Sequence, residues 1–538
     1  MNGSTAISRV GAPLADAPGA VARQTGHRST ALLKARRSAW WALAFALAFL
    51  APLAAIAEEA APGLTLEDAV KQALANNFSI QVESYSVPIA DAAVKEAYAR
   101  FDPQLWFNYS DGTNQQPQRR ASETGQPLPP TIFKTASFNT GVQGQLPLGL
   151  SYQVGGNTSN SRTTYNNFAD DFTSFAGASI RLPLLRGFGP AATLTTIRIA
   201  RTNRSISEWD FRATVINTIT NVAYAFDEVL FARARLRSAL RSRELASQLY
   251  TENERRQAVG SMSDYDVLTA RARIATREEA ILFAERALRD AENTFKRLVS
   301  DDTSPRLLQD SPALEAPPAP TEIQVDVTAD LPVALQLRPD YQQAKLSVAQ
   351  SNYNYRLYRN QLLPAIDLVG NYGYNGVGDT FPSSRTEVNN RDFPAYTGGV
   401  QFSIPLTSTA ERARYHSARL MRERAEMAVR QLEQDVVVRV GTAAGQIETG
   451  WKRVEADRAS RQLSEQALEA ELKRLRAGPG NTFFVLQQQE TLANDEVREA
   501  RAIADYRNAL AEYDRQLGRT LERYNIDVAE LGSEKSSK

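Results

Sequence analysis

The chain of 538 residues carries 62 basic and 61 acidic side chains and no cysteine. The charge balance excludes a broadly basic nucleic-acid-binding protein, and the lack of cysteine excludes disulfides, thiolate metal sites, a cysteine nucleophile and a lipid anchor on cysteine. The chain has two histidines, too few to favour a catalytic triad built on histidine. Its mean hydropathy of −0.38 is too polar for a bundle of membrane-spanning helices. We therefore expect no catalytic residue, no cofactor, no metal site and no nucleic-acid partner.

An uncharged run of 19 residues, 39–57, stands near the N-terminus. Three basic residues precede it, it contains Pro52, and it ends in the Ala-x-Ala pattern Ala55–Ile56–Ala57. This is the pattern of a secretory signal, so we predict a cleaved signal peptide over 1–57; the alternative is a retained single-span anchor. Cleavage removes six bases and one acid, and the mature chain then has 56 bases against 60 acids, a net charge of −4.

The next part of the chain predicts a helix and then strands. The helix begins at a capping box formed by Thr65 and Asp68. Apolar and polar residues alternate with period two in six aromatic-rich segments: 104–109, 136–143, 150–154, 176–182, 366–374 and 396–404. Such alternation is typical of membrane β-barrel strands, and an ordinary half-buried sheet gives the same pattern. The segments 111–135, 157–171 and 375–394 are rich in turn residues and predict exposed loops.

Long helices are predicted on either side of the later strands. No proline occurs from 191 to 304 or from 406 to 478, and the first of these runs has one glycine, Gly260. A single helix over 191–258 would be roughly 100 Å long. Both runs also contain apolar residues at alternating steps of three and four, a heptad seam that requires a neighbouring helix. The first seam is Val215, Ile219, Val222, Phe226 and Val229, and the second is Val437, Val440, Ala444, Ile447, Trp451 and Val454.

The chain repeats its own plan. Pro103 matches Pro364, and Pro183 matches Pro405, each at a border between helix and strand. Arg256-x-x-x-Gly260 and Arg474-x-x-x-Gly478 are each followed at the same distance by Val-Leu, and each glycine is expected to turn one helix back along the next. We predict a first repeat over 64–300, a linker over 301–332, a second repeat over 333–528 and a disordered tail over 529–538. The first repeat has 39 extra residues between its prolines, which fits an additional strand hairpin at 136–156.

In this order of motifs the sequence resembles the TolC family of outer-membrane efflux proteins. The resemblance spans 64–528 and rests on the opening segment 64–77, on Leu184-Leu-Arg-Gly-Phe-Gly189 and on the two Gly-x7-Leu tips. It implies a membrane β-barrel joined to a long α-helical coiled-coil barrel, with two internal repeats, in a trimer that forms one shared barrel and tunnel. Two or three hairpins cannot close a barrel, and an open sheet edge cannot lie in lipid, so association is also expected on physical grounds. Family members usually contribute four strands each, and the insertion predicts four or six here.

The resemblance also implies a function. It is that of an exit duct in the cell outer membrane, with the helical part in the periplasm, for a tripartite efflux pump or a type I secretion system. The implied partners are two further copies of the chain, a periplasmic adaptor protein, an inner-membrane pump and outer-membrane lipid. The alternative is a periplasmic structural coiled coil or adhesin, which explains the heptads but not six alternating strands. An exported hydrolase is disfavoured because no catalytic grouping stands out.

Gate candidates lie just after the two tip glycines. In the family, acidic residues after the second glycine can ring the periplasmic entrance; here those positions hold Phe484 and Gln487. Phe483 and Phe484 instead predict an apolar constriction that gates by dewetting, and the alternative is that they pack between helices. Asp264 and Asp266 could form a negative ring at the first tip, and the alternative is the ordinary preference for aspartate at a helix start.

The tips themselves are the predicted docking surface for the adaptor. By resemblance the contact involves Val259, Gly260 and Ser261 at the first tip and Ala477, Gly478 and Pro479 at the second. Turn geometry alone also explains the glycines. Arg256 and Arg474, one helical turn before each glycine, are expected either to pair with carboxylates on neighbouring helices or to neutralise helix C-termini.

Overall fold

The computed structural model of the chain describes residues 63–118, 125, 128–309, 311–478 and 480–528. The chain divides into two units, Met1–Ala61 and Pro62–Lys538, and the architecture below is that of the second unit. The predicted signal peptide (1–57) and the predicted tail (529–538) lie outside the described residues.

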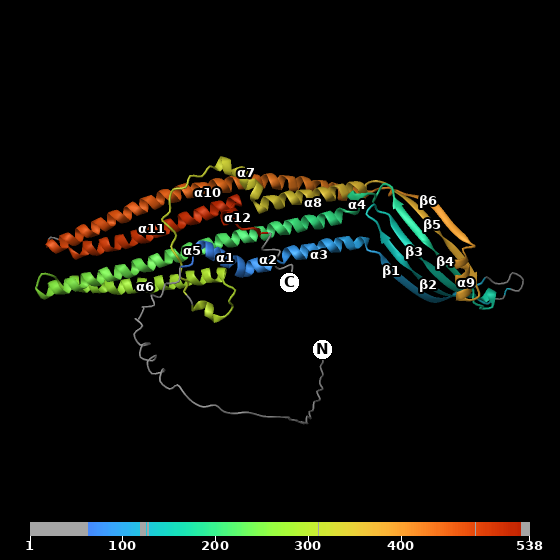
Figure 1. Cartoon of the computed structure of the whole chain (residues 1–538), viewed down its shortest axis with the longest axis horizontal. Coiled ribbons are helices and arrows are strands. Elements are labelled where there is room, and N and C mark those ends of the chain that lie inside the picture. Colours follow the sequence, from blue (N-terminus) through green and yellow to red (C-terminus); the bar gives the residue numbers. More distant parts are fainter. Residues whose placement is uncertain (1–62, 119–124, 126–127, 310, 479, 529–538) are drawn as a thin grey trace, which may run out of the picture. The chain divides into compact units, whose positions relative to one another are not determined.

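The elements follow the same general order in both halves of the chain (Figure 1). The first half contains α1 (Leu66–Asn76), α2 (Phe78–Glu83), α3 (Ser86–Tyr98), η1 (Ala99–Phe101), β1 (Gln104–Gln116), β2 (Thr131–Gln145), β3 (Ser151–Thr163), η2 (Thr164–Asn166), β4 (Phe172–Pro183), α4 (Pro190–Thr193), α5 (Thr195–Ala258) and α6 (Asp264–Val299). The second half contains η3 (Pro305–Leu308), α7 (Val327–Leu337), α8 (Pro339–Gln361), β5 (Ala365–Gly378), α9 (Phe381–Asn390), β6 (Pro394–Ser403), α10 (Thr409–Ala477), α11 (Thr482–Leu517) and α12 (Thr520–Arg523).

Helices and strands are segregated within this unit. The pairs α5/α6 and α10/α11 form two helical hairpins, and α11 packs along α5. All six strands form one antiparallel sheet in the order β1-β2-β3-β4-β5-β6, at the opposite end of α5 and α10 from the hairpin tips (Figure 1). The sheet therefore joins the two halves through the pairing of β4 with β5, although the helices α4 to α8 separate these strands along the chain.

The strands were predicted at the correct positions, but the predicted strands were shorter than those in the structure. All six alternating segments are strands, and the insertion in the first half supplies the hairpin of β2 and β3, so one copy contributes six strands rather than four. The predicted loops 111–135, 157–171 and 375–394 were too long, because the strands continue into them and α9 lies within the third. Residues such as Thr113, Thr135 and Ser159 read as loop by composition, but ladder hydrogen bonds recruit them into the strands.

Strand register gives the sheet one apolar and one polar face. Leu105 is opposite Val142, Val142 is opposite Val154, and directly opposed residues share a face. This apolar face remains exposed in the single copy: Leu105, Phe107, Tyr109, Phe138, Val142, Val154, Ile180, Leu368, Tyr372, Tyr396, Val400 and Phe402. An apolar surface of this extent requires a cover other than water.

The helical hairpins are held together by the predicted seams. Every residue of the first seam is buried, and these residues lie in one core cluster with Phe295 and Leu521. In the second seam Val440, Ala444, Ile447 and Val454 are buried, but the prediction for Val437 was wrong: it is 47% exposed, and Val436 is buried instead. Residues 436–438 are three consecutive valines, so the apolar pattern alone did not fix which one faces the neighbouring helix.

The segment between the halves is fastened to the helices through its backbone. The Arg507 guanidinium on α11 donates to the carbonyls of Pro317 and Pro318, at 3.2 and 2.9 Å, and the Tyr506 hydroxyl donates to the Thr321 carbonyl at 2.9 Å. Arg507 also lies 3.6 Å from the buried Asp227, whose pKa is raised by burial to about 7. The linker therefore runs against the outside of the hairpins in a fixed path.

Among the residues that the structure describes, no helix is both long enough and apolar enough to cross a membrane.

Candidate functional site

The first hairpin tip is a glycine turn followed by a capped helix. The amide of Gly260 (φ +77°) donates to the Gln257 carbonyl at 2.8 Å, and that of Ser261 to the Arg256 carbonyl at 2.9 Å. A positive φ strains any residue with a Cβ, which accounts for the glycine. The hydroxyl of Ser263 then caps α6 by accepting from the Asp266 amide at 3.2 Å.

The second tip makes the same turn with one change. Gly478 (φ +100°) ends α10, and its amide donates to the Leu475 carbonyl at 3.3 Å. The bond to the Arg474 carbonyl comes from Gly480 at 3.2 Å, because the intervening residue is Pro479, which has no amide hydrogen. Pro479 itself lies outside the described residues. Asn481 caps α11 by accepting from the Phe483 amide at 2.9 Å.

The two tips are bonded to each other. One guanidinium nitrogen of Arg256 donates to the Leu475 carbonyl at 2.8 Å, and another donates to Glu252 on its own helix at 2.8 Å. Of the two roles predicted for Arg256, the structure supports the second: it satisfies a helix C-terminus, that of the other hairpin. Its carboxylate partner lies on its own helix and not on a neighbouring one. The guanidinium of Arg474, at the matching position, has one partner among the described residues, Glu471 on its own helix, at 2.7 Å.

An apolar cluster supports this contact. Leu249 of α5 packs with Leu468 and Leu475 of α10 and with Val485, Leu486 and Leu492 of α11. Beside it the Thr482 hydroxyl lies 3.5 Å from Oδ1 of Asn253, and both residues are buried. The Asn253 side-chain nitrogen is buried and has no hydrogen-bond partner among the described residues. The tips are thus one packed unit rather than two independent turns.

The predicted acidic gate residues both have local partners. Asp266 accepts a hydrogen bond from the Ser263 hydroxyl at 2.6 Å, which completes a reciprocal cap. Asp264 accepts from the Gln257 side-chain amide at 2.6 Å, across the turn. The helix-start reading therefore accounts for the position of Asp266, while Asp264 is exposed beside the turn. A negative ring formed by these residues stays a prediction.

The aromatic gate residues have no cover in the single copy. Phe483 is 60% exposed and Phe484 is 49% exposed, and their ring centroids are 5.7 Å apart. Gln487 is exposed one turn further along α11. Packing between helices of the same copy therefore does not explain these rings. Val259, Gly260, Ser261, Ala477 and Gly478 are also exposed, as a docking surface requires.

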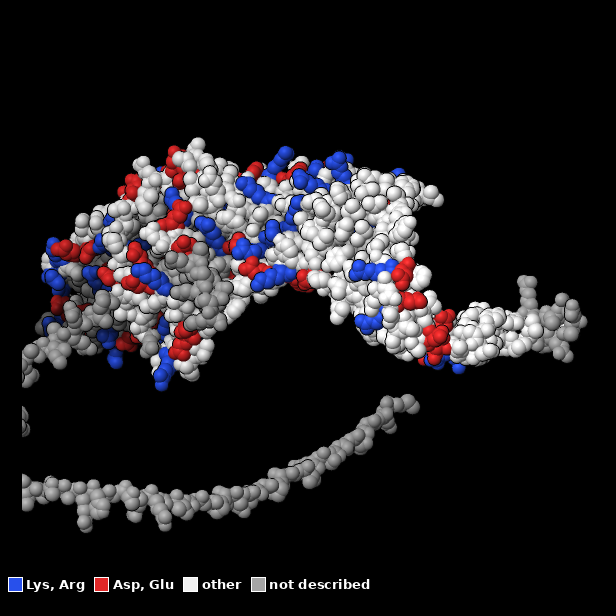
Figure 2. All heavy atoms as spheres, turned by 45° about the vertical axis from the view of Figure 1, so that its right-hand side comes forward, with Lys and Arg blue, Asp and Glu red and all other residues white. Residues whose placement is uncertain are grey.

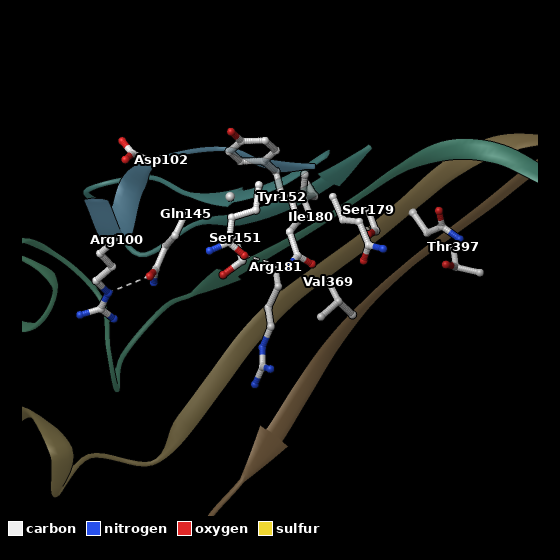
Figure 3. Close-up of a pocket in the computed structure, with 16 residues that line it drawn as sticks. Arg100, Asp102, Gln145, Ser151, Tyr152, Ser179, Ile180, Arg181, Val369 and Thr397 are labelled. Atoms are coloured by element: carbon white, nitrogen blue, oxygen red, sulfur yellow. Dashed lines mark hydrogen bonds between the residues drawn. The ribbon is translucent and has the colours of Figure 1, made fainter. Parts of the chain in front are cut away.

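A second feature, which sequence reasoning missed, lies on the polar face of the sheet. Directly opposed residues form a row across all six strands: Gln104, Gln143, Gln153, Ser179, Asn371 and Thr397. The row lines a hollow of about 590 Å³ (Figure 3). The period-two alternation predicted which strand positions are polar, but only the register shows that these positions lie opposite one another on all six strands.

Arginines stand at the helical end of this hollow. Arg100, from η1, and Arg181, from β4, are among the residues that line it (Figure 3), and Nε of Arg100 donates to Gln145 at 3.0 Å. Nη2 of Arg181 lies 2.5 Å from Oδ2 of the buried Asp367 on β5, which ties the two halves together. Arg186 and Arg414 join them around an adjoining hollow of about 570 Å³.

Nothing in these sites resembles a catalytic or metal centre. The described residues contain no group of three or more His, Asp or Glu side chains arranged to hold a metal ion. The hydroxyls and amides of the polar row can form hydrogen bonds with a passing solute but include no activated nucleophile.

Comparison with known proteins gives a family and a fold. The model of the outer membrane efflux protein family matches residues 69–300 and again residues 331–519. Among curated proteins no significant sequence match is found.

Several solved structures have the same fold. The CmeC outer membrane channel of Campylobacter jejuni matches with a TM-score of 0.64 and 16% identity, over 87% of this chain and 89% of that one. The outer membrane protein VceC of Vibrio cholerae matches at 0.61 and 15%, over 84% and 96%. The open state of the Neisseria gonorrhoeae MtrE outer membrane channel matches at 0.60 and 17%, over 85% and 89%.

Proposed function

The chain belongs to the outer membrane efflux protein family, and from that premise we propose that three copies join their sheets edge to edge and continue as one helical tunnel toward an inner-membrane pump. The protein is an outer-membrane efflux channel of the kind used by tripartite pumps, with its helices in the periplasm, and it is not an enzyme. The periplasmic structural coiled coil or adhesin, considered from the sequence, is set aside because both halves match the efflux family.

The observation that carries the proposal is the sheet. It has an exposed apolar face, a polar face and two unpaired edges, at β1 and β6. Lipid tolerates the apolar face but not the free backbone groups of an edge. Pairing β6 of one copy with β1 of the next satisfies these groups, and three copies give a closed barrel of eighteen strands, six from each. The polar row then faces the bore and the aromatic residues face lipid, as in other barrels of the outer membrane.

The opposite end supplies the entrance. Three pairs of tips would surround the periplasmic mouth, with the Phe483 and Phe484 rings as an apolar constriction and Asp264 as a source of negative charge. The exposed turns at Val259–Ser261 and Ala477–Gly478 would receive a hairpin of the adaptor. The pump would be an efflux transporter; a type I secretion transporter is the second candidate for the same docking surface.

Three measurements test the proposal together. Native mass spectrometry of the protein extracted from outer membranes should give three copies, and the same preparation should form discrete conducting channels in planar bilayers. A deletion strain should accumulate a fluorescent dye such as ethidium faster than a strain carrying the gene. A protein found as a monomer in the soluble periplasmic fraction, with no channel activity, would overturn it.

A further inference from the structure

The polar face of the sheet is almost free of charge. Register assigns 40 strand residues to this face, and all but two of them are uncharged. The two are Arg181 and Asp367, which pair with each other at its helical end. Glutamine, asparagine, serine, threonine and glycine make up most of the rest, so along most of its length this face cannot discriminate between anions and cations.

Charge accumulates where the sheet meets the helices. The hollow at this junction is lined by Arg100, Arg181, Arg186 and Arg414, against the carboxylates of Asp367 and Glu411. Asp102 lines the neighbouring hollow of the polar row. Figure 2 shows that charged side chains of both signs crowd the helical part, whereas the surface toward the sheet carries fewer.

Three of these arginines form no ion pair with a carboxylate of the described chain. Within the described chain, Arg181 alone of the four is in an ion pair, and Arg100 is bonded only to the neutral side chain of Gln145. Arg186 lies in the turn that follows β4, whose shape is fixed by the Gly187 amide donating to Oδ1 of Asn360 at 2.8 Å. Arg414 is in the first turns of α10. Different elements thus bring unpaired guanidinium groups to one hollow.

We propose that this junction, which we name the arginine collar (Arg100, Arg181, Arg186 and Arg414), attracts anions and the anionic groups of solutes in transit, carboxylates above all. The inference rests on the proposed duct, in which three copies of the collar surround the bore. A planar guanidinium without a partner offers paired donors that match a carboxylate. Among the described residues, the junction then adds charge selection at the helical end of a polar face that carries almost no other charge.

Asp367 sets the strength of the collar. Its carboxylate neutralises Arg181, whose side chain remains 59% exposed. Removing the carboxylate charge would free a fourth guanidinium in each copy, whereas removing arginine charge would weaken the collar. The two changes are therefore expected to shift ion selectivity in opposite directions, which general damage to the barrel would not do.

The experiment is the reversal potential of single channels under a gradient of potassium chloride, repeated with potassium acetate as a carboxylate probe. For Arg186→Gln with Arg414→Gln we expect the anion-to-cation permeability ratio to fall roughly twentyfold, since six charges about 10 Å from the ion in 0.1 M salt act in opposite directions on anions and cations, about fivefold on each. The double Lys variant should keep the wild-type ratio in potassium chloride but lower it in potassium acetate, because lysine lacks the paired donors. Asp367→Asn should raise the ratio in both salts. Arg286→Gln, on α6 and paired with Asp290 at 3.6 Å, is the matched control and should change nothing.

The outcomes separate this inference from the proposed function. Channels of normal conductance whose permeability ratio is the same in the Gln variant as in wild type overturn the collar and leave the duct standing. The same holds if Asp367→Asn and the Gln variant shift the ratio in the same direction. A wild-type protein that forms no channels overturns the duct, and the collar falls with it.

Discussion

The two hairpin tips share one plan but use their side chains differently. At the first tip the polar groups satisfy one another: Ser263 and Asp266 cap the helix, and Asp264 accepts from Gln257. At the second tip the cap is a single asparagine, and the residues after it are two exposed phenylalanines. The hydrogen bond between the hairpins also comes from one side: Arg256 donates to the Leu475 carbonyl of the other hairpin, whereas the guanidinium of Arg474 contacts Glu471 on its own helix.

This difference teaches that a repeated backbone does not imply a repeated function. The first tip is built for local stability and for holding its neighbour. The second leaves apolar rings uncovered in the single copy, where only another copy or a partner can cover them. Four test variants, each compared with a second variant, examine this division in order of expected effect on local stability.

Gly480→Ala should have the largest effect. An added Cβ would clash with the Leu475 amide nitrogen, so the turn must open, at a cost of about 3 kcal/mol. At the first tip the matching position holds Met262, and Met262→Gly should cost less than about 1 kcal/mol. Amide hydrogen exchange around 256–267 and around 474–485 measures the difference. Equal effects at the two tips would show that they are structurally equivalent.

Arg256→Ala should come next. The change removes the guanidinium donor from the Leu475 carbonyl at the end of α10, which keeps only the longer bond from the Gly478 amide. It should cost about 2 kcal/mol, measured by hydrogen exchange at both tips. The same variant should raise the open probability of channels in planar bilayers, because the hairpins are less firmly joined. Arg474→Ala is the matched control, and its exposed contact with Glu471 should be worth less than about 0.5 kcal/mol. If the two variants behave alike, the hydrogen bond between the hairpins has no role.

Asp266→Ala should destabilise the start of α6 by about 1 kcal/mol, because it removes half of the reciprocal cap and a favourable charge at the helix N-terminus. Its channels should keep the wild-type ion selectivity. Asp264→Asn should do the reverse, with little change in hydrogen exchange and a loss of cation preference at the entrance. A change of selectivity in Asp266→Ala alone would contradict this assignment.

The double change Phe483→Ala and Phe484→Ala should leave stability within about 0.5 kcal/mol of wild type, since both rings are exposed. Conductance should nevertheless rise, because the narrowest part of the entrance becomes wider and less apolar. Val485→Ala, at a fully buried neighbour, is the control and should cost about 2 kcal/mol without opening the channel. Unchanged conductance in the double variant would remove these residues from the gate.

Much of the fold followed from patterns with a single physical period. Period-two alternation placed all six strands, and proline-free heptads placed α5 and α10 to within a few residues. The family match was equally accessible, since both repeats leave motifs in the sequence. The errors came where composition was ambiguous. The polar ends of the strands were predicted to be loops, and three adjacent valines left open which one packs in the seam, so that Val437 was predicted in place of Val436.

The candidate sites were harder to predict. The residues of both tips were identified, because a glycine between two helical patterns marks a turn. Their contacts were not: the reach of Arg256 to Leu475 joins positions 219 residues apart, and nothing in the local pattern encodes it. The polar row and the arginine collar were missed for the same reason, since they depend on strands that pair across an intervening helical region.

By itself the sequence determined the elements, their order and their repetition, because periodicity, proline and glycine act over a few residues. It also determined that one face of the sheet is apolar and the other polar. Only the tertiary structure decided which residues oppose one another across six strands, which arginines share a hollow, and that Asp266 is engaged in a cap while Phe483 and Phe484 stay free. Those outcomes depend on register and on contacts between distant segments, which are fixed only when the whole sheet and both hairpins pack together.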